Sequence, residues 1–85
     1  MKSIMLGEYY PSLGKLINIE DETEYNIKHV PGSINIPYDK LLYNKDSLLN
    51  KSETYYIYCN GGYKSKRAVN ILEAYGYKVV QVIIN

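Results

Sequence analysis

The chain has 85 residues, with ten basic and nine acidic side chains and a formal net charge of +1. This length predicts one domain covering residues 1–85, because there is no room for a second hydrophobic core. A nearly neutral chain whose basic residues are spread along the sequence argues against nucleic acid as a partner.

One cysteine and one histidine leave too few ligands for a metal site, and we expect neither a metal nor any other cofactor. No apolar segment reaches membrane-spanning length, and the apolar run at the N-terminus is too short for a signal peptide. We therefore expect no membrane partner and a location in the reducing cytoplasm, where a free thiol stays available for chemistry.

The first half of the chain predicts short strands alternating with short helices. Residues 16–19 are typical of a buried strand, and the acidic residues after them predict a loop and a helix capped by Asp21 or Thr23. Pro31 and Gly32 then predict a turn, followed by a strand over residues 34–36. A helix broken near Asn44 is predicted over residues 39–49, with four leucines on its apolar side: Leu41, Leu42, Leu48 and Leu49.

The second half predicts a strand, a loop, a helix and a last strand. Residues 55–58 form the first strand, and residues 64–75 carry apolar side chains, the last of them Tyr75, at helical spacing before a left-handed cap at Gly76. Residues 78–84 are typical of a strand buried on both faces. The alternation predicts an α/β fold with a mostly parallel central sheet flanked by helices, and ligands bind beyond the carboxyl ends of such strands.

Cys59 stands at one such end, between a predicted strand and a predicted helix. The amides and the dipole of a helix N-terminus favour the thiolate, which is the nucleophilic form of cysteine. Gly61 and Gly62 let the backbone turn sharply and aim its amides inward, toward an anion held on the sulfur. The sequence therefore predicts a reactive thiol in an anion-binding loop, although most free cysteines are small buried hydrophobic residues.

The residues around the loop have simpler interpretations. Lys66 and Arg67 are more typical of a solvated helix surface than of a binding site. His29 lies in the predicted turn before Pro31, and we assign it a structural role. Tyr63 lies at the tip of the loop. The sequence supports two positions for its side chain equally, at the entrance to the site or in solvent.

Several segments together resemble the single-domain rhodanese family. In chain order they are residues 16–19, Glu24-Tyr25, residues 29–37, residues 56–65 and Gly76-Tyr77. The resemblance covers most of the chain and implies a rhodanese-like fold and a sulfurtransferase of the thiosulfate type. In such an enzyme Cys59 takes a sulfane sulfur from thiosulfate or a persulfide, holds it as a persulfide and passes it to a thiol or protein acceptor.

The resemblance also implies the residues that bind the donor. The backbone amides of the loop point at the persulfide sulfur, and Ser65 caps the helix or donates to the site. The implied binding residues are Asn60, Gly61, Gly62, Tyr63, Lys64 and Ser65. Lys64 stands where the family usually has arginine, so we predict weaker binding of thiosulfate, because lysine lacks the planar fork that grips an oxyanion in two places.

Two departures from the family pattern carry expectations. Asn18 and Glu20 replace an aspartate and an arginine of many members, so a buried charge pair is expected to be lost, and Glu20 either repels an anionic donor or points to solvent. The chain stops just after the last predicted strand, where the family usually continues into a helix. We expect this to leave part of the sheet uncovered and a homodimer to form there.

Two other functions stay open. The first is a catalytically weak rhodanese-like module that binds a partner or senses sulfur status. The second is an arsenate reductase or phosphatase of related fold, although the loop from Cys59 to Lys64 is shorter than such enzymes need. A P-loop is excluded, since Tyr63 separates the glycines from Lys64.

Overall fold

A computed structural model describes residues 1–84 of the chain. Its elements are, in order, β1 (Lys2–Met5), the 3₁₀ turns η1 (Leu6–Glu8) and η2 (Pro11–Leu13), β2 (Lys15–Asn18), α1 (Glu22–Ile27), β3 (Ile34–Asn35), α2 (Tyr38–Tyr43), α3 (Lys45–Leu48), β4 (Thr54–Tyr58), α4 (Tyr63–Ala74) and β5 (Lys78–Ile83). Strands and helices alternate as the sequence predicts, except that β1 was not expected.

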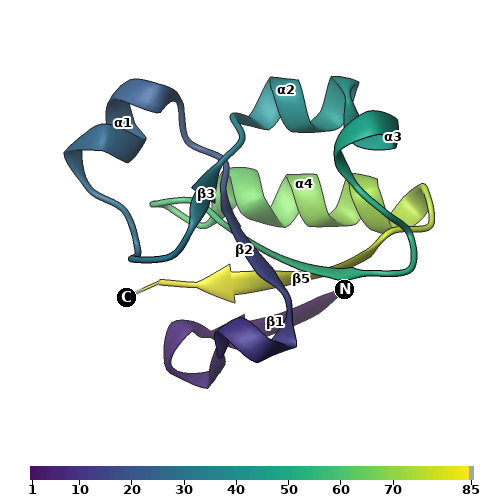
Figure 1. Cartoon of the computed structure of the whole chain (residues 1–85), viewed down its shortest axis with the longest axis horizontal. Helices are drawn as coiled ribbons and strands as arrows, with labels where there is room; N and C mark the ends of the chain where they lie inside the picture. Colours follow the sequence, from purple (N-terminus) through teal and green to yellow (C-terminus); the bar gives the residue numbers. More distant parts are fainter. Residues whose placement is uncertain (85) are drawn as a thin grey trace.

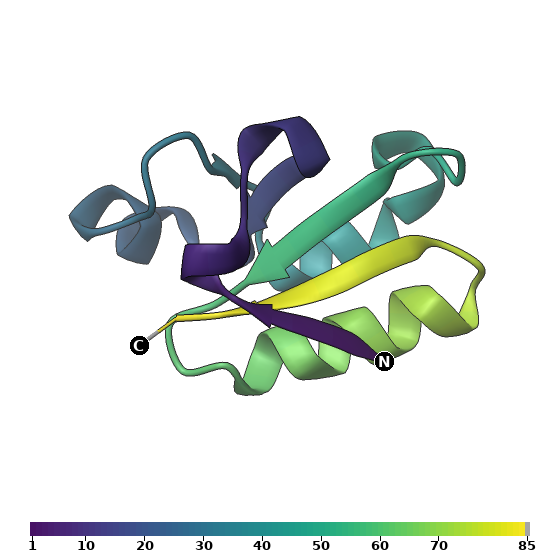
Figure 2. The same cartoon turned by 90° about the horizontal axis from the view of Figure 1, so that it is seen from below.

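All five strands run parallel in one sheet, in the order β1-β5-β4-β2-β3. Figure 2 shows β1 at the edge, alongside β5 and then β4. Three of the four residues of β1 are exposed, so its sequence carries little of the apolar signal of a buried strand. The predicted α/β fold with a parallel central sheet is confirmed.

The sheet is covered on both faces, but unequally. Helices α2 and α4 lie on one face, as Figure 1 shows, over a core that includes Ile17, Ile57 and Leu72. The N-terminal turns lie on the opposite side of the sheet, where a smaller cluster forms around Leu16, Tyr58 and Val82. The middle strands β4 and β5 are therefore buried on both faces, as the run of β-branched residues in β5 predicted.

The predicted cap at Asp21 and the predicted break at Asn44 are confirmed, but two predicted core positions are wrong. Oδ1 of Asp21 accepts the amide of Glu24 at 2.8 Å, which caps α1, and α2 and α3 are separated at Asn44. Leu48, the last residue of the single-turn α3, is 38% exposed, while the next residue, Leu49, is buried. Tyr75, at 58% exposure, lies past the end of α4, where its ring contacts the Lys45 ammonium.

The carboxyl ends of β2, β4 and β5 meet at one end of the sheet. Cys59 follows the last residue of β4 directly, and Glu20 lies two residues beyond β2. Parallel strands thus bring these two positions, 39 residues apart in the chain, to the same edge. Among residues 1–84, no helix has the length and apolar character that a membrane crossing requires.

Candidate active site

The sulfur of Cys59 lies at the N-terminal end of α4. Its residue is only 2% exposed, and Sγ accepts the backbone amide of Ser65 at 3.2 Å. The Oγ atom of Ser65 lies 3.3 Å from the same sulfur. In this contact the thiol donates to Oγ, so the donor that the helix presents to the sulfur is the Ser65 amide, at a helix start where negative charge is stabilised.

The cysteine loop, residues 59–64, contains one residue in the left-handed backbone conformation. Gly62 has φ of +82° and precedes the first residue of α4, whereas Gly61 does not adopt positive φ. Only Gly62 therefore requires glycine for conformational reasons. In the described part of the chain, no protein acceptor is found for the amides of Gly61, Gly62, Tyr63 and Lys64.

The amide of Asn60, predicted to point at the persulfide, has another partner. It donates to Oε2 of Glu20 at 2.7 Å. The prediction for Asn60 was therefore wrong in this respect, because a carboxylate from the end of β2 already uses that donor. Sequence reasoning did not find this contact, since 40 residues separate the two groups along the chain.

The other carboxylate oxygen of Glu20 forms an ion pair with Lys64. Nζ of Lys64 lies 2.6 Å from Oε1, while Glu20 is only 7% exposed and the Lys64 side chain is about half exposed. The alternative that Glu20 points to solvent is thus wrong. Asn18 carries no charge, so positions 18 and 20 hold no charge pair, and Glu20 instead pairs with Lys64 across the site.

This pair shifts the titration of both side chains. Burial raises the pKa of Glu20, but the hydrogen bonds from Lys64 and from the Asn60 amide, together with the lysine charge, outweigh it and hold this pKa below its usual value. The hydrogen bond to Glu20 raises the pKa of Lys64, against the opposing effect of burial. Both groups are therefore ionised at neutral pH.

Two asparagines hold the backbone of Glu20. The amide of Glu20 donates to Oδ1 of Asn18 at 2.9 Å, and Nδ2 of Asn35 donates to the Glu20 carbonyl at 2.8 Å. Asn18 and Asn35 are partners in the β2–β3 register. Nδ2 of Asn18 is buried with no hydrogen-bond partner in residues 1–84.

Gln81 of β5 forms hydrogen bonds to the cysteine loop and to the start of α4. The sequence did not predict this role. Its Nε2 donates to the carbonyl of Gly62 at 2.8 Å and to Oγ of Ser65 at 2.9 Å. Oγ of Ser65 also donates to the Gly62 carbonyl at 3.1 Å. The Ser65 side chain does not cap α4, whose N-cap is Gly62, and it is the backbone amide of Ser65 that donates to the sulfur. A polar residue inside an otherwise apolar strand was the signal that could have identified Gln81.

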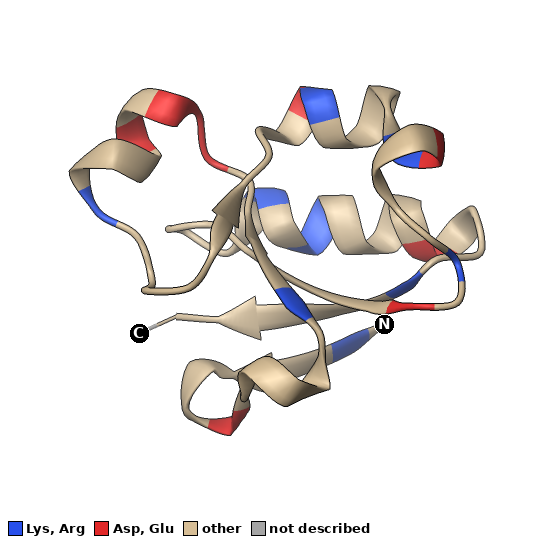
Figure 3. Ribbon diagram, in the orientation of Figure 1, with Lys and Arg blue, Asp and Glu red and all other residues tan. Residues whose placement is uncertain are grey.

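The remaining candidate residues lie at the surface or away from the sulfur. Tyr63 is 73% exposed at the start of α4, and Lys66 and Arg67 are exposed on its next turn, where Figure 3 shows basic positions. The ring of His29 stacks on Tyr25, and its Nδ1 lies 2.7 Å from the Tyr25 carbonyl, which fits the structural role assigned to it. No group of three or more metal-ligating side chains occurs within residues 1–84.

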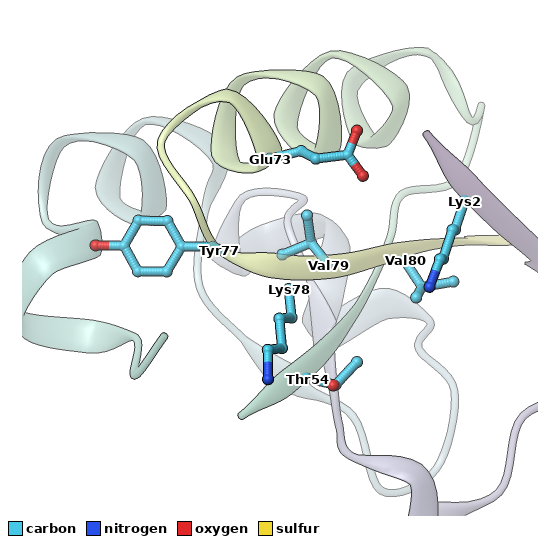
Figure 4. A pocket seen from close by; sticks show the side chains of 7 residues that line it. All are labelled: Lys2, Thr54, Glu73, Tyr77, Lys78, Val79 and Val80. Carbon is cyan, nitrogen blue, oxygen red and sulfur yellow. The ribbon is translucent and has the colours of Figure 1, made fainter. Parts of the chain in front are cut away.

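A separate hollow lies at the opposite end of the strands. Lys2, Thr54 and Lys78, at the amino ends of β1, β4 and β5, line it together with Glu73 of α4 (Figure 4). It holds no cysteine and is at the far end of β4 from Cys59. The cysteine loop is therefore the place where chemistry is expected in this fold.

Comparison with known proteins identifies the family. The family model described as "Rhodanese-like domain" matches residues 6–85. The chain belongs to this family. Among solved structures, a rhodanese-like domain protein from Staphylococcus aureus is 35% identical, with a TM-score of 0.79, over 96% of this chain and 84% of that one. The rhodanese-like fold that the sequence predicted is thereby confirmed.

Two curated relatives are named as sulfurtransferases. The chain is 33% identical over 66 residues to the thiosulfate sulfurtransferase PspE of Escherichia coli, covering 76% of this chain and 64% of that protein. It is 29% identical over 89 residues to the thiosulfate:glutathione sulfurtransferase of Saccharomyces cerevisiae, covering 91% of this chain and 63% of that protein. The chain thus spans slightly less than two thirds of the length of each.

Proposed function

We propose that this rhodanese-like domain is a sulfurtransferase that carries sulfane sulfur as a persulfide on Cys59. The observation that supports this most is the position of the sulfur. It accepts the Ser65 amide at the start of α4, beside four loop amides that have no protein acceptor within residues 1–84. Such donors stabilise a terminal sulfur that bears negative charge. The named activities of the curated relatives agree with this function.

The proposed reaction has two steps. In the first, the Cys59 thiolate attacks the sulfane sulfur of a donor such as thiosulfate, the sulfur–sulfur bond of the donor breaks, and sulfite leaves with the electron pair. In the second, a thiol or protein acceptor attacks the outer sulfur and the Cys59 thiolate is restored. No cofactor enters either step. A free thiol persists in a reducing compartment, and the cytoplasm is therefore part of the proposal.

Intact-protein mass spectrometry tests the carrier role. We expect brief exposure to thiosulfate or to a polysulfide to add the mass of one sulfur atom to the native chain, reversibly with dithiothreitol, and to leave Cys59→Ser unchanged. Steady-state kinetics of the native chain should follow a ping-pong pattern. An adduct of equal yield on Cys59→Ser, or no adduct with any sulfane donor, would overturn the proposal.

A binding or sensor module is the second candidate, and the Glu20–Lys64 pair favours it. Lys64, the lysine of the cysteine loop, is already paired with Glu20, and Cys59 is almost fully buried. Turnover with thiosulfate is therefore expected to be slow. This alternative predicts a protein partner that Cys59→Ser still retains, together with turnover far below the rate of sulfur loading.

A homodimer stays a prediction, and a monomeric mass by light scattering would exclude it.

A further inference from the structure

We propose that Glu20 sets the donor specificity of the Cys59 site and selects an organic hydropersulfide, R–S–SH, over thiosulfate. This inference rests on the proposed sulfurtransferase function and narrows it. Both oxygens of the Glu20 carboxylate are used inside the site, one by the Asn60 amide and one by Lys64. Two groups that an oxyanion would otherwise bind are thus already occupied by an anion of the protein itself.

Glu20 is a fixed part of the site and not a mobile surface side chain. Its residue is 7% exposed, and its backbone is held at both the amide and the carbonyl by Asn18 and Asn35. Its contact with Asn60 is to a backbone amide, which keeps the same position whatever the side chain there does. The carboxylate therefore stays in place when a donor arrives.

The charge around Lys64 disfavours a dianion. A hollow beside this lysine is also lined by Asp21 and Asp39. Three carboxylates thus accompany this lysine, because Glu20 pairs with it and Asp21 and Asp39 line the same hollow. Figure 3 shows the acidic segment entering α1 near the basic start of α4. Thiosulfate carries two negative charges into these surroundings, whereas a hydropersulfide reacts as a neutral sulfur–sulfur group. Coulomb repulsion therefore acts mainly against thiosulfate.

A second hollow offers a place for the organic substituent. It is lined by the apolar side chains of Leu6, Val30, Pro31 and Ile84, and by Asn60, the residue next to Cys59. Lys28 and His29 also line it and supply groups that can bind a carboxylate on that substituent. Thiosulfate has no carbon portion to fill this space. The two hollows thus favour the same class of donor.

The transfer step balances without any further reagent. The Cys59 thiolate attacks the outer sulfur of R–S–SH, a bond forms between Sγ and that sulfur, and the sulfur–sulfur bond of the donor breaks. The electron pair of that bond leaves on R–S⁻, which takes the proton from the transferred sulfur. The products are the Cys59 persulfide anion and R–SH, and no external oxidant or reductant is consumed.

The test compares two donors on four proteins. Glutathione persulfide and thiosulfate are each mixed with the native chain, Glu20→Gln, Glu20→Gln/Lys64→Gln and Glu22→Gln, and the second-order rate of sulfur addition to Cys59 is followed by intact mass. Glutamine keeps the size of Glu20 and an oxygen for the Asn60 amide but removes the charge. Glu22→Gln removes one charge two residues away, at an exposed position that makes no ion pair within residues 1–84.

We expect the native chain to load from glutathione persulfide faster than from thiosulfate. Glu20→Gln should raise the thiosulfate rate by at least about tenfold, because it removes a charge and releases Lys64, and it should change the glutathione persulfide rate by less than about threefold. The double variant should lose the gain, since the released ammonium is gone. Glu22→Gln should behave like the native chain.

The outcomes separate this inference from the function on which it rests. Equal native rates with both donors, or a thiosulfate rate that Glu20→Gln leaves unchanged, would refute the specificity role while the sulfurtransferase function stands. Loading from neither donor would remove both. Retained loading from glutathione persulfide in Glu20→Gln shows that the variant is folded, so an unchanged thiosulfate rate cannot be attributed to unfolding.

Discussion

Replacing Gln81 by methionine is predicted to make Cys59 a poorer nucleophile near neutral pH. The carbonyl of Gly62 has three potential donors, namely Nε2 of Gln81 at 2.8 Å, Oγ of Ser65 at 3.1 Å and the amide of Lys66 at 3.2 Å. A carbonyl oxygen has two lone pairs. While Cys59 is a thiol, it donates to Oγ of Ser65 at 3.3 Å and the Ser65 hydroxyl donates to the Gly62 carbonyl. When the thiol ionises, the hydroxyl hydrogen can turn to the thiolate, because Gln81 and Lys66 still use both lone pairs of that carbonyl.

The size of the effect follows from one hydrogen bond. Without the Gln81 amide, the Ser65 hydroxyl stays on the Gly62 carbonyl, and the thiolate lacks this donor. A hydrogen bond to a charged group contributes about 1.5–3 kcal/mol, and the long distance to sulfur places this one near the lower limit. Since about 1.4 kcal/mol corresponds to a tenfold change in rate, the rate at which Cys59 reacts at neutral pH should fall by about tenfold.

The assay is the rate of Cys59 alkylation by iodoacetamide at neutral pH. It requires no sulfur transfer and therefore stands apart from the proposed function. The matched control places Gln81→Met in a Ser65→Ala background, where no further loss of rate is expected because the hydroxyl is absent. An unchanged rate in Gln81→Met, or an equal loss in the Ser65→Ala background, would refute the role given to Gln81. Thermal unfolding checks that each variant is folded.

Three further predictions concern the loop and its charge pair. Gly62→Ala should cost about 1–2 kcal/mol of unfolding free energy because alanine resists positive φ, although the new Cβ, 3.9 Å from Nε2 of Gln81, meets no clash. Gly61→Ala, at ordinary φ and in open space, should cost much less in the same urea titration. Equal losses in the two variants would contradict the argument. Glu20 has a folded pKa below its ordinary value of 4.5, so its contribution to stability is present above that value and is lost as the pH falls through the folded pKa. The difference in unfolding free energy between the native chain and Glu20→Gln should therefore shrink in acid. A difference that does not vary with pH would argue against the pair. Lys64→Arg should lower the KM for thiosulfate, since arginine can hold Glu20 and still present donors to the ligand, and an unchanged KM would count against this reasoning.

The sequence by itself determined the fold and the place of the candidate nucleophile. These depend on local patterns, such as the alternation of apolar strands with amphipathic helices, the capping position of Asp21 and the left-handed position of Gly76. The order of Cys59, its glycines and the helix after them placed the sulfur at a helix start, because all of these residues are neighbours in the chain. The edge strand β1 was not predicted, because three of its four residues are exposed and carry no pattern of a buried strand.

Only the tertiary structure decided what surrounds the sulfur. The parallel sheet brings the ends of β2 and β5 next to the loop after β4, so Glu20 reaches Lys64 and Asn60, and Gln81 reaches Gly62 and Ser65. Residues 16 to 44 positions apart in the chain meet in these contacts, and no local pattern encodes their distances. The charge that a donor meets at Cys59 is therefore set by strand register and packing, and a buried carboxylate that looks like a departure in the sequence becomes part of the site.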